Sequence, residues 1–247
     1  MRQATTNSTS LKPTTTRLFL ALESATSHQS VAVFRDHQLL ASLACESGRP
    51  LTPQLIPIID QLLSSVSLQL SNLEGLVVSI GPGTFTGLRV GLATMTAFRL
   101  ALQIPLVGVS TLEGLAWNHP VTDLPLLSTI GIRQGIVYWA LFRWENQQMV
   151  CVKGSQIGDI IDVCAGLNEP TIVLGDGWMQ NRETLFSKGF PLVEAPPAEQ
   201  WPSAKGIGMA GRVLLERGDF LPLGCTPQYI QPSYAEISKT QSLNPIG

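Results

Sequence analysis

The chain has little charge, few cysteines and histidines, and no long apolar run. Charged residues make up 14% of its 247 residues and the formal net charge is −2, so it has no basic surface of the kind that binds nucleic acid directly. We therefore expect no direct, autonomous binding of RNA, which leaves open an indirect role beside an enzyme that acts on RNA. No apolar stretch reaches the roughly 18–20 residues that cross a bilayer, so we expect no membrane partner.

The four cysteines lie far apart with no C-x-x-C pair, and the three histidines show no metal-ligand spacing. This pattern is typical of reduced thiols, and it predicts a cytoplasmic protein without a metal site. Residues 1–16 are rich in serine and threonine. We expect a disordered tail there, with an organelle transit peptide as the alternative, and a second tail at 236–247.

Apolar runs separated by short polar turns predict two successive α/β units with the same element order, β-β-β-α-β-α. The first unit has strands and helices expected at 18–23, 30–34, 39–45, 53–65, 76–80, 88–103, 105–110 and from 111 onward. The second has them at 126–132, 136–144, 149–156, 159–167, 171–174 and 178–188, and a last helix is expected at 204–217.

This duplication predicts the two-lobed, ribonuclease-H-like α/β fold of actin, the sugar kinases and Hsp70. The lobes are expected at 17–118 and 119–235, with the helix 204–217 packing back on the first lobe. In that architecture a ligand lies between the halves, near the turn after the first strand of each. Those turns are at 23–26 and 131–134 here, but the fold by itself does not specify a function.

The most specific motif is GPGTFTGLRVG at 81–91, between an expected strand and an expected helix. It is not a P-loop, because Leu88-Arg89 stands where Lys-Ser/Thr is required, and its glycines do not have the dinucleotide-binding spacing. One interpretation is an anion-binding turn at a helix N-terminus; the other is a tight turn that lets the helix approach the sheet. The candidate ligand cleft comprises Glu23, Ser24, Gly81, Gly83, Thr84, Phe85, Thr86, Gly87 and Arg89.

The longer segment GPGTFTGLRVGLATMTAFRLALQIPLVGVSTLEGLA, at 81–116, resembles the TsaB (YeaZ) family. The usual loop of that family, GPGSFTGLRIG, differs here only at Thr84 and Val90. Further matches are LALESATSHQSVAVF at 20–34, RQGIVYWALF at 133–142, LGDGW at 174–178 and PQYIQ at 227–231.

The resemblance implies a non-catalytic subunit that pairs with a TsaD-type transferase in forming N6-threonylcarbamoyladenosine (t6A) in tRNA. A TsaE-type ATPase and a second copy of the chain, as a homodimer, are the other implied protein partners. No cofactor of its own is expected, and ATP or ADP binding at the complex interface stays open. By itself the chain is not expected to be an enzyme.

The chain departs from the family pattern in ways that favour a non-catalytic role. Glu23 stands where the family usually has Asp, Gly131 replaces the acid of an Asp-Ala-Arg turn, and Gln231 replaces an arginine. The helix that carries H-x-x-x-H in TsaD has no histidine here. Asp176 is interpreted as a turn residue, and Glu23 as an acceptor of hydrogen bonds from the backbone of residues 83–86. The alternative function, a small ATP-dependent kinase or phosphotransferase, lacks an identifiable second acid, and a peptidase lacks the G-x-S-x-G elbow.

The helix expected at 53–65 has more apolar residues than one core stripe needs, which is typical of a partner-facing helix. The alternative is a helix buried completely between the sheet and its neighbours. Together with two residues of the following long helix, the predicted interface comprises Leu55, Ile58, Ile59, Leu62, Leu92 and Met95.

Overall fold

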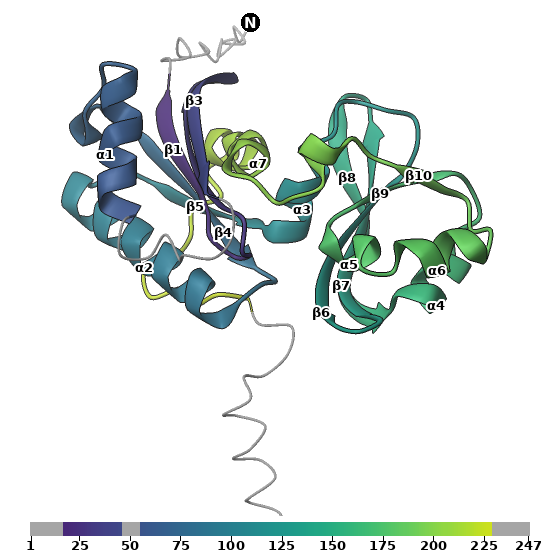
Figure 1. Ribbon diagram of the computed structural model, residues 1–247. Coiled ribbons are helices and arrows are strands. Elements are labelled where there is room, and N and C mark those ends of the chain that lie inside the picture. The colour runs from purple at the N-terminus through teal and green to yellow at the C-terminus, as the bar shows by residue number, and fades with distance from the viewer. Residues whose placement is uncertain (1–16, 46–54, 229–247) are drawn as a thin grey trace, which may run out of the picture.

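The computed structural model describes residues 17–45 and 55–228. The tails predicted at 1–16 and 236–247, and the Gln231 position, lie outside the described residues. Two α/β lobes lie side by side (Figure 1), each built on a five-stranded sheet with the orders β3-β2-β1-β4-β5 and β10-β9-β6-β7-β8. Within the described helices, none is both long and apolar enough to cross a membrane.

The two sheets share one topology, which confirms the predicted duplicated fold. In each sheet the first three strands form antiparallel pairs, and the later strands run parallel to the first. The first sheet comprises β1 Leu18–Glu23, β2 Gln29–Arg35, β3 Gln38–Cys45, β4 Gly75–Gly81 and β5 Leu106–Ser110. The second comprises β6 Leu126–Arg133, β7 Ile136–Glu145, β8 Gln148–Asp159, β9 Thr171–Leu174 and β10 Leu192–Glu194. The three-residue β10 was not predicted, because it is too short to show an alternating pattern.

The helices agree with the predicted ranges except at two places. They are α1 Leu55–Ser65, α2 Phe85–Leu102, α3 Thr111–Ala116, α4 Ile160–Ala165, α5 Asp176–Met179, α6 Arg182–Ser187 and α7 Ala204–Arg217, with 3₁₀ turns at Leu70–Asn72 and Pro197–Glu199. Helix α2 begins three residues before the predicted start, because the second half of the glycine motif is already helical. The single helix predicted at 178–188 is divided into α5 and α6 at Gln180-Asn181, where the Asn181 side chain donates to the Gly177 carbonyl at 2.9 Å.

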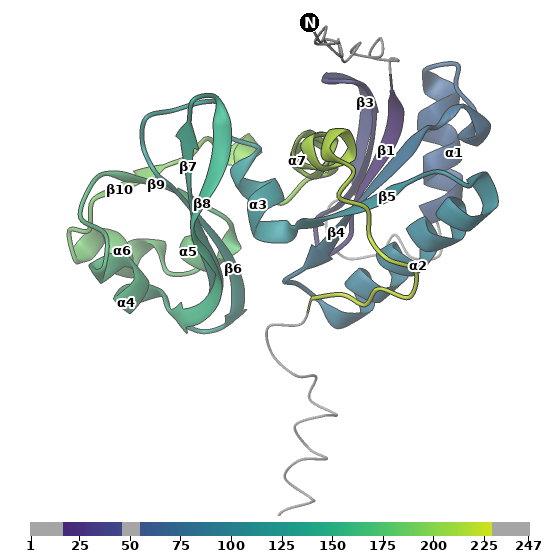
Figure 2. The same cartoon turned by 180° about the vertical axis from the view of Figure 1, so that it is seen from behind.

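Strand β1 is apolar from Leu18 to Leu22 because both of its faces are covered. Alternate side chains of a strand point to opposite faces, so Leu20 and Leu22 pack toward α1 and α2, whereas Phe19 and Ala21 pack toward α7. Helix α7 therefore covers the first sheet although it follows the second sheet in sequence. Seen from behind (Figure 2), the segment after α7 runs back along β5 and α2, held by the Leu221 N–H, which donates to the Leu106 carbonyl at 2.9 Å.

Candidate functional site

The glycine motif packs directly on the turn that follows β1. The Thr84 N–H donates to the Ala25 carbonyl at 2.6 Å, and the Ser24 hydroxyl donates to the Gly87 carbonyl at 3.0 Å. A Cβ at Gly83 would lie 2.3 Å from the Ala25 oxygen, and one at Gly87 would lie 2.0 Å from the Ser24 oxygen. These two glycines are therefore required by the close approach of two backbones, as the tight-turn interpretation expects.

The first glycine of the motif meets a second chain segment. Gly81 has a φ of +118°, and a Cβ there would lie 2.6 Å from the carbonyl oxygen of Gln228, whose N–H donates to the Ile80 carbonyl. The start of α2 is open to solvent at Thr84, Phe85 and Thr86. The exposed Arg89 holds its guanidinium 3.7 Å from the centre of the Phe85 ring.

Glu23 is the buried acid of the candidate cleft, and its side chain has no exposure to solvent. Its Oε1 accepts a hydrogen bond from the Ala25 N–H at 2.6 Å, while its Oε2 finds no partner among the described residues. Burial raises the pKa of Glu23 to about 7, against the opposing effect of the hydrogen bond from the Ala25 N–H. The predicted bonds from the backbone of residues 83–86 were wrong, because the Ala25 carbonyl takes the Thr84 N–H instead.

A second acid does lie at the turn after β6, although the sequence interpretation found none. Asp176, at the start of α5, accepts a hydrogen bond from the Gly131 N–H at 3.0 Å. Burial raises the pKa of Asp176, and the Gly131 bond and the nearby His28 of the first lobe oppose that rise. The side chain of Gln180 occupies the space beside Gly131, 2.9 Å from where a Cβ would be. The parallel pairing of β6 with β9, whose ends meet at one edge, is the signal that could have placed Asp176 there.

The cleft residues do not assemble a recognisable metal centre. In residues 17–45 and 55–228, no group of three or more histidine, cysteine, aspartate or glutamate side chains is arranged to hold a metal ion. The two acids, Glu23 and Asp176, belong to different lobes, and each is tied to backbone N–H groups of its own lobe.

The structure corrects the residues predicted for the partner interface. Five of the six lie in the core between α1, α2 and the first sheet, each 5% exposed or less; these are Leu55, Ile59, Leu62, Leu92 and Met95. The sixth, Ile58, is half-buried. The apolar face of α1 is wide because the helix packs against both β2 and β3, so most of its apolar side chains serve the core.

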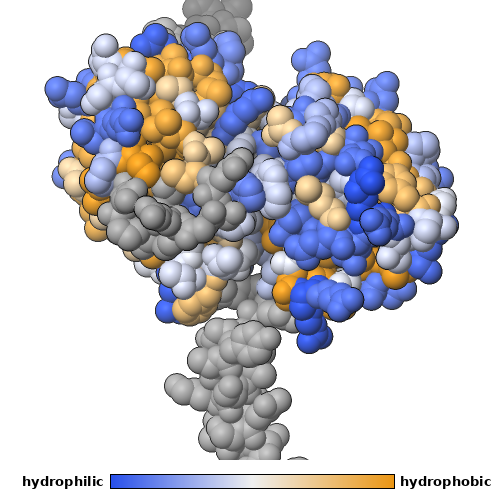
Figure 3. All heavy atoms as spheres, in the orientation of Figure 1, coloured by the Kyte–Doolittle hydropathy of each residue, from blue (hydrophilic) through white to orange (hydrophobic). Residues whose placement is uncertain are grey.

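Other apolar side chains of the same two helices are nevertheless exposed. Ile56 of α1 is 62% exposed and Leu100 of α2 is 61% exposed, and apolar residues gather on this side of the first lobe (Figure 3). A groove of about 570 Å³ runs between the outer face of α2 and the segment 225–227. It is lined by Arg89, Leu92, Ala93, Thr96, Ala97, Leu100, Cys225, Thr226 and Pro227. We call Ile56, Leu100 and this groove the outer α1–α2 face.

Comparison with known proteins identifies the family. The model of the family TsaD: tRNA N6-adenosine threonylcarbamoyltransferase matches residues 46–200, which is more than half of the chain. The tRNA threonylcarbamoyladenosine biosynthesis protein TsaB of Escherichia coli is 27% identical over 83% of this chain and 85% of its own length. The TsaB protein of Bacillus subtilis is 24% identical over 90% of this chain and 98% of its own length. The structure of YeaZ from Pseudomonas aeruginosa, 23% identical, superposes with a TM-score of 0.73 over 87% of this chain and all of that chain, which supports the fold. The chain therefore belongs to the TsaD family and, within it, to the TsaB (YeaZ) group.

Proposed function

We propose that this chain is a non-catalytic subunit that pairs with a TsaD-type transferase and activates it in the formation of t6A in tRNA. The observation that carries this proposal is the outer α1–α2 face, an apolar surface exposed among the described residues of a chain whose named relatives are tRNA threonylcarbamoyladenosine biosynthesis proteins. Exposed apolar side chains and apolar grooves are typical of surfaces that bind another protein.

The state of the candidate cleft supports the same role. In the glycine motif, the turn after β1 occupies the space in front of Gly83 and Gly87. The Glu23 carboxyl is fully buried, with a pKa near neutrality. A buried carboxyl behind a filled loop is poorly placed to act on a substrate, whereas its bond from the Ala25 N–H lets it fix the turn on which the loop packs. We therefore assign the chemistry of the reaction to the transferase subunit.

The proposal also assigns the partners of the chain. The transferase is the first occupant of the outer α1–α2 face, and a second copy of the chain competes for it when the transferase is absent. We assign the TsaE-type ATPase, and any bound ATP or ADP, to the assembled complex rather than to the isolated chain. Contact with tRNA is then made by the transferase.

The proposal is tested by charging the outer α1–α2 face. The double variant Ile56→Glu with Leu100→Glu should stay folded, because both side chains are more than half exposed. Two desolvated charges in an interface cost enough to weaken binding by about 100-fold or more. The matched control is Val121→Glu with Val152→Glu, which charges two exposed valines elsewhere. The two measurements are size-exclusion chromatography with a TsaD-type transferase and mass spectrometry of t6A in tRNA modified by the reconstituted complex.

Wild-type complex formation by the Ile56/Leu100 variant would overturn the assignment of the interface. Unchanged t6A in the tRNA of source cells depleted of this chain would overturn the assignment of the pathway, provided that re-expression and depletion are both verified.

One observation favours the alternative, a small ATP-dependent kinase or phosphotransferase. Such an enzyme needs an acid in each lobe, and Asp176, which accepts from the Gly131 N–H, supplies a carboxyl in the second lobe as Glu23 does in the first. Isothermal titration with ATP and Mg²⁺ separates the two functions. Heat of saturable binding to the isolated chain would favour the kinase, and its absence at millimolar ATP would favour the partner subunit.

A further inference from the structure

Helix α3 packs on both α7 and the second sheet, and two chain segments, residues 117–125 and residues 195–203, run between the lobes beside it. Adjacent residues of the second segment are attached to opposite lobes. Gln200, 2% exposed, belongs to the second lobe through its side chain. Its Oε1 accepts from the Gly175 N–H at 3.1 Å and from the Trp178 indole N–H at 2.9 Å. Its Nε2 donates to the Ala195 carbonyl at 2.8 Å.

The next residue, Trp201, is attached to the first lobe. Its ring stacks on the imidazole of His28, with the ring centroids 3.6 Å apart and the planes 17° from parallel. Three residues later, the Ala204 N–H donates to the hydroxyl of Ser30 at 2.8 Å. His28 and Ser30 stand on either side of the first residue of β2, so this part of the connection follows the first lobe.

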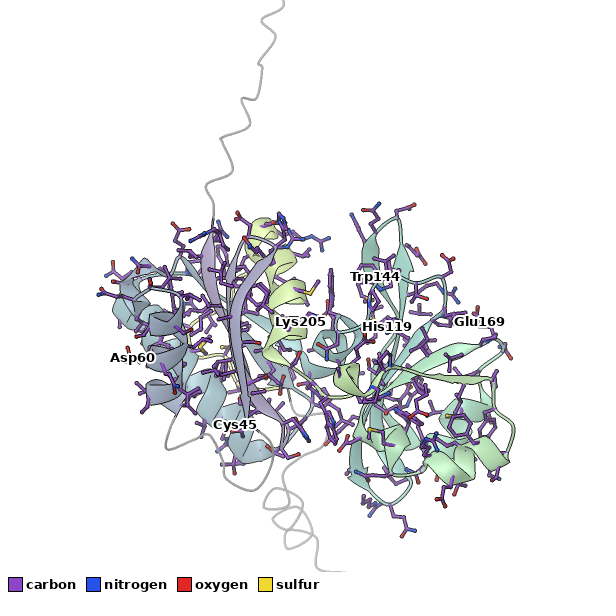
Figure 4. The ribbon with its side chains drawn as sticks, turned by 45° about the horizontal axis from the view of Figure 1, so that its top comes forward. Cys45, Asp60, His119, Trp144, Glu169 and Lys205 are labelled. Carbon is purple, nitrogen blue, oxygen red and sulfur yellow. The ribbon has the colours of Figure 1, made fainter. Side chains whose placement is uncertain are left out.

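The two connecting segments are also bound to each other. The Asn118 side chain donates to the Trp201 carbonyl at 2.7 Å and accepts from the Ser203 hydroxyl at 2.6 Å. His119 and Glu199 are in contact at 2.5 Å, and Figure 4 shows His119 on the side of the second lobe that faces the first. The connections therefore form one cross-linked unit rather than two independent linkers.

We propose that this unit, which we call the lobe lock (His28, Gln200 and Trp201), holds the two lobes in one fixed arrangement. Opening or closing of the lobes would have to rotate the chain between Gln200 and Trp201. If Gln200 moved with the first lobe, the buried Gly175 and Trp178 donors would lose their acceptor. If Trp201 moved with the second lobe, its stack on His28 would separate. The lobes then do not close around a ligand, and a partner docked on the first lobe finds the second lobe in a constant position.

The test is hydrogen–deuterium exchange with mass spectrometry on the full chain by itself. The variant His28→Ala removes the stack and leaves Gln200 bound to the second lobe. The matched control is His37→Ala, since His37 is exposed in the turn between β2 and β3. Loss of a stacked ring pair should speed amide exchange at 195–204 by about five- to tenfold. Exchange in β4 should stay at the wild-type rate, which shows that the variant remains folded.

A second arm uses saturating ATP with Mg²⁺ on the wild-type chain. The lock predicts no change in exchange at 195–204 or at the turns facing the cleft. Equal exchange in the His28 and His37 variants, or a protection of both lobes by ATP, would overturn the lock. Because the measurement needs no partner, its failure is distinct from a failure of the proposed function, which is read from complex formation with the transferase.

Discussion

Replacing Glu23 with glutamine should remove a large part of the pH dependence of the free energy of unfolding. Burial raises the pKa of this carboxyl from 4.5 to about 7 in the folded chain. Below pH 4.5 the carboxyl is protonated in both the folded and the unfolded state, so it does not lower the free energy of unfolding. As the pH rises toward 7, the unfolded state loses its proton while the folded state keeps it, so stability falls; above 7 the loss levels off.

The magnitude follows from the two pKa values. A difference of about 2.5 corresponds to a total loss of about 3.4 kcal/mol, of which about 2.5 kcal/mol falls between pH 5 and pH 8. Glutamine has nearly the same shape, and its carbonyl can still accept from the Ala25 N–H. Its amide nitrogen takes the place of Oε2, which has no partner in the described structure. Burying that amide without an acceptor lowers the free energy of unfolding by about 1 kcal/mol at every pH.

The assay is urea denaturation at pH 5, 6, 7 and 8, followed by circular dichroism. The stability of Glu23→Gln relative to wild type should rise by about 2.5 kcal/mol from pH 5 to pH 8. Glu145→Gln, at an exposed position, is the control and should show no such rise. A wild-type pH profile in the Glu23 variant would refute the reasoning, because it would mean that the buried carboxyl ionises as easily as an exposed one.

Two further predictions concern the glycine motif and the contact of Asp176 with Gly131. Gly87→Ala should destabilise the chain by about 2–4 kcal/mol, since its Cβ would lie 2.0 Å from the Ser24 oxygen. The control Gly154→Ala, with open space around the new Cβ, should leave stability close to that of wild type. Equal urea midpoints for the two variants would contradict the prediction. Asp176→Ala should cost about 1–3 kcal/mol, because the Gly131 N–H loses its acceptor, while Asp176→Asn, which keeps an acceptor, should stay near wild type in the same assay. If the asparagine variant lost as much stability as the alanine variant, the turn would require the charge of Asp176 rather than its hydrogen bond.

The fold could be predicted from the sequence because its signals are local. Strand β1 is apolar from Leu18 to Leu22, and its burial on two faces requires this. Helices α1 and α7 have apolar residues at helical spacing, and the repeated order of elements predicts two lobes of the same topology. The glycine motif likewise predicts a tight turn between a strand and a helix, and the structure has that turn between β4 and α2.

The candidate site could be predicted only in part, because burial and long-range pairing are properties of the folded chain. Leu62 and Ile56 are both apolar residues of α1, yet one is 1% and the other 62% exposed. Leu62 lies on the buried stripe of α1 that packs in the core of the first lobe, whereas Ile56 lies off that stripe. Residue type alone does not separate the two, so counting apolar residues on the helix overestimated the surface left for a partner. Asp176 lies 45 residues from Gly131 in the chain, and only the parallel pairing of β9 with β6 brings its carboxyl to that turn.

The sequence by itself thus determined the architecture, the family resemblance and the place of the glycine motif, because these depend on spacing and residue type within short segments. The tertiary structure decided which apolar side chains are open to a partner, that Glu23 is sealed with a pKa near 7, and that Gln200 and Trp201 bind opposite lobes. These properties arise where segments far apart in the chain exclude water from one another, and the free energies of burial and hydrogen bonding are set only at such contacts.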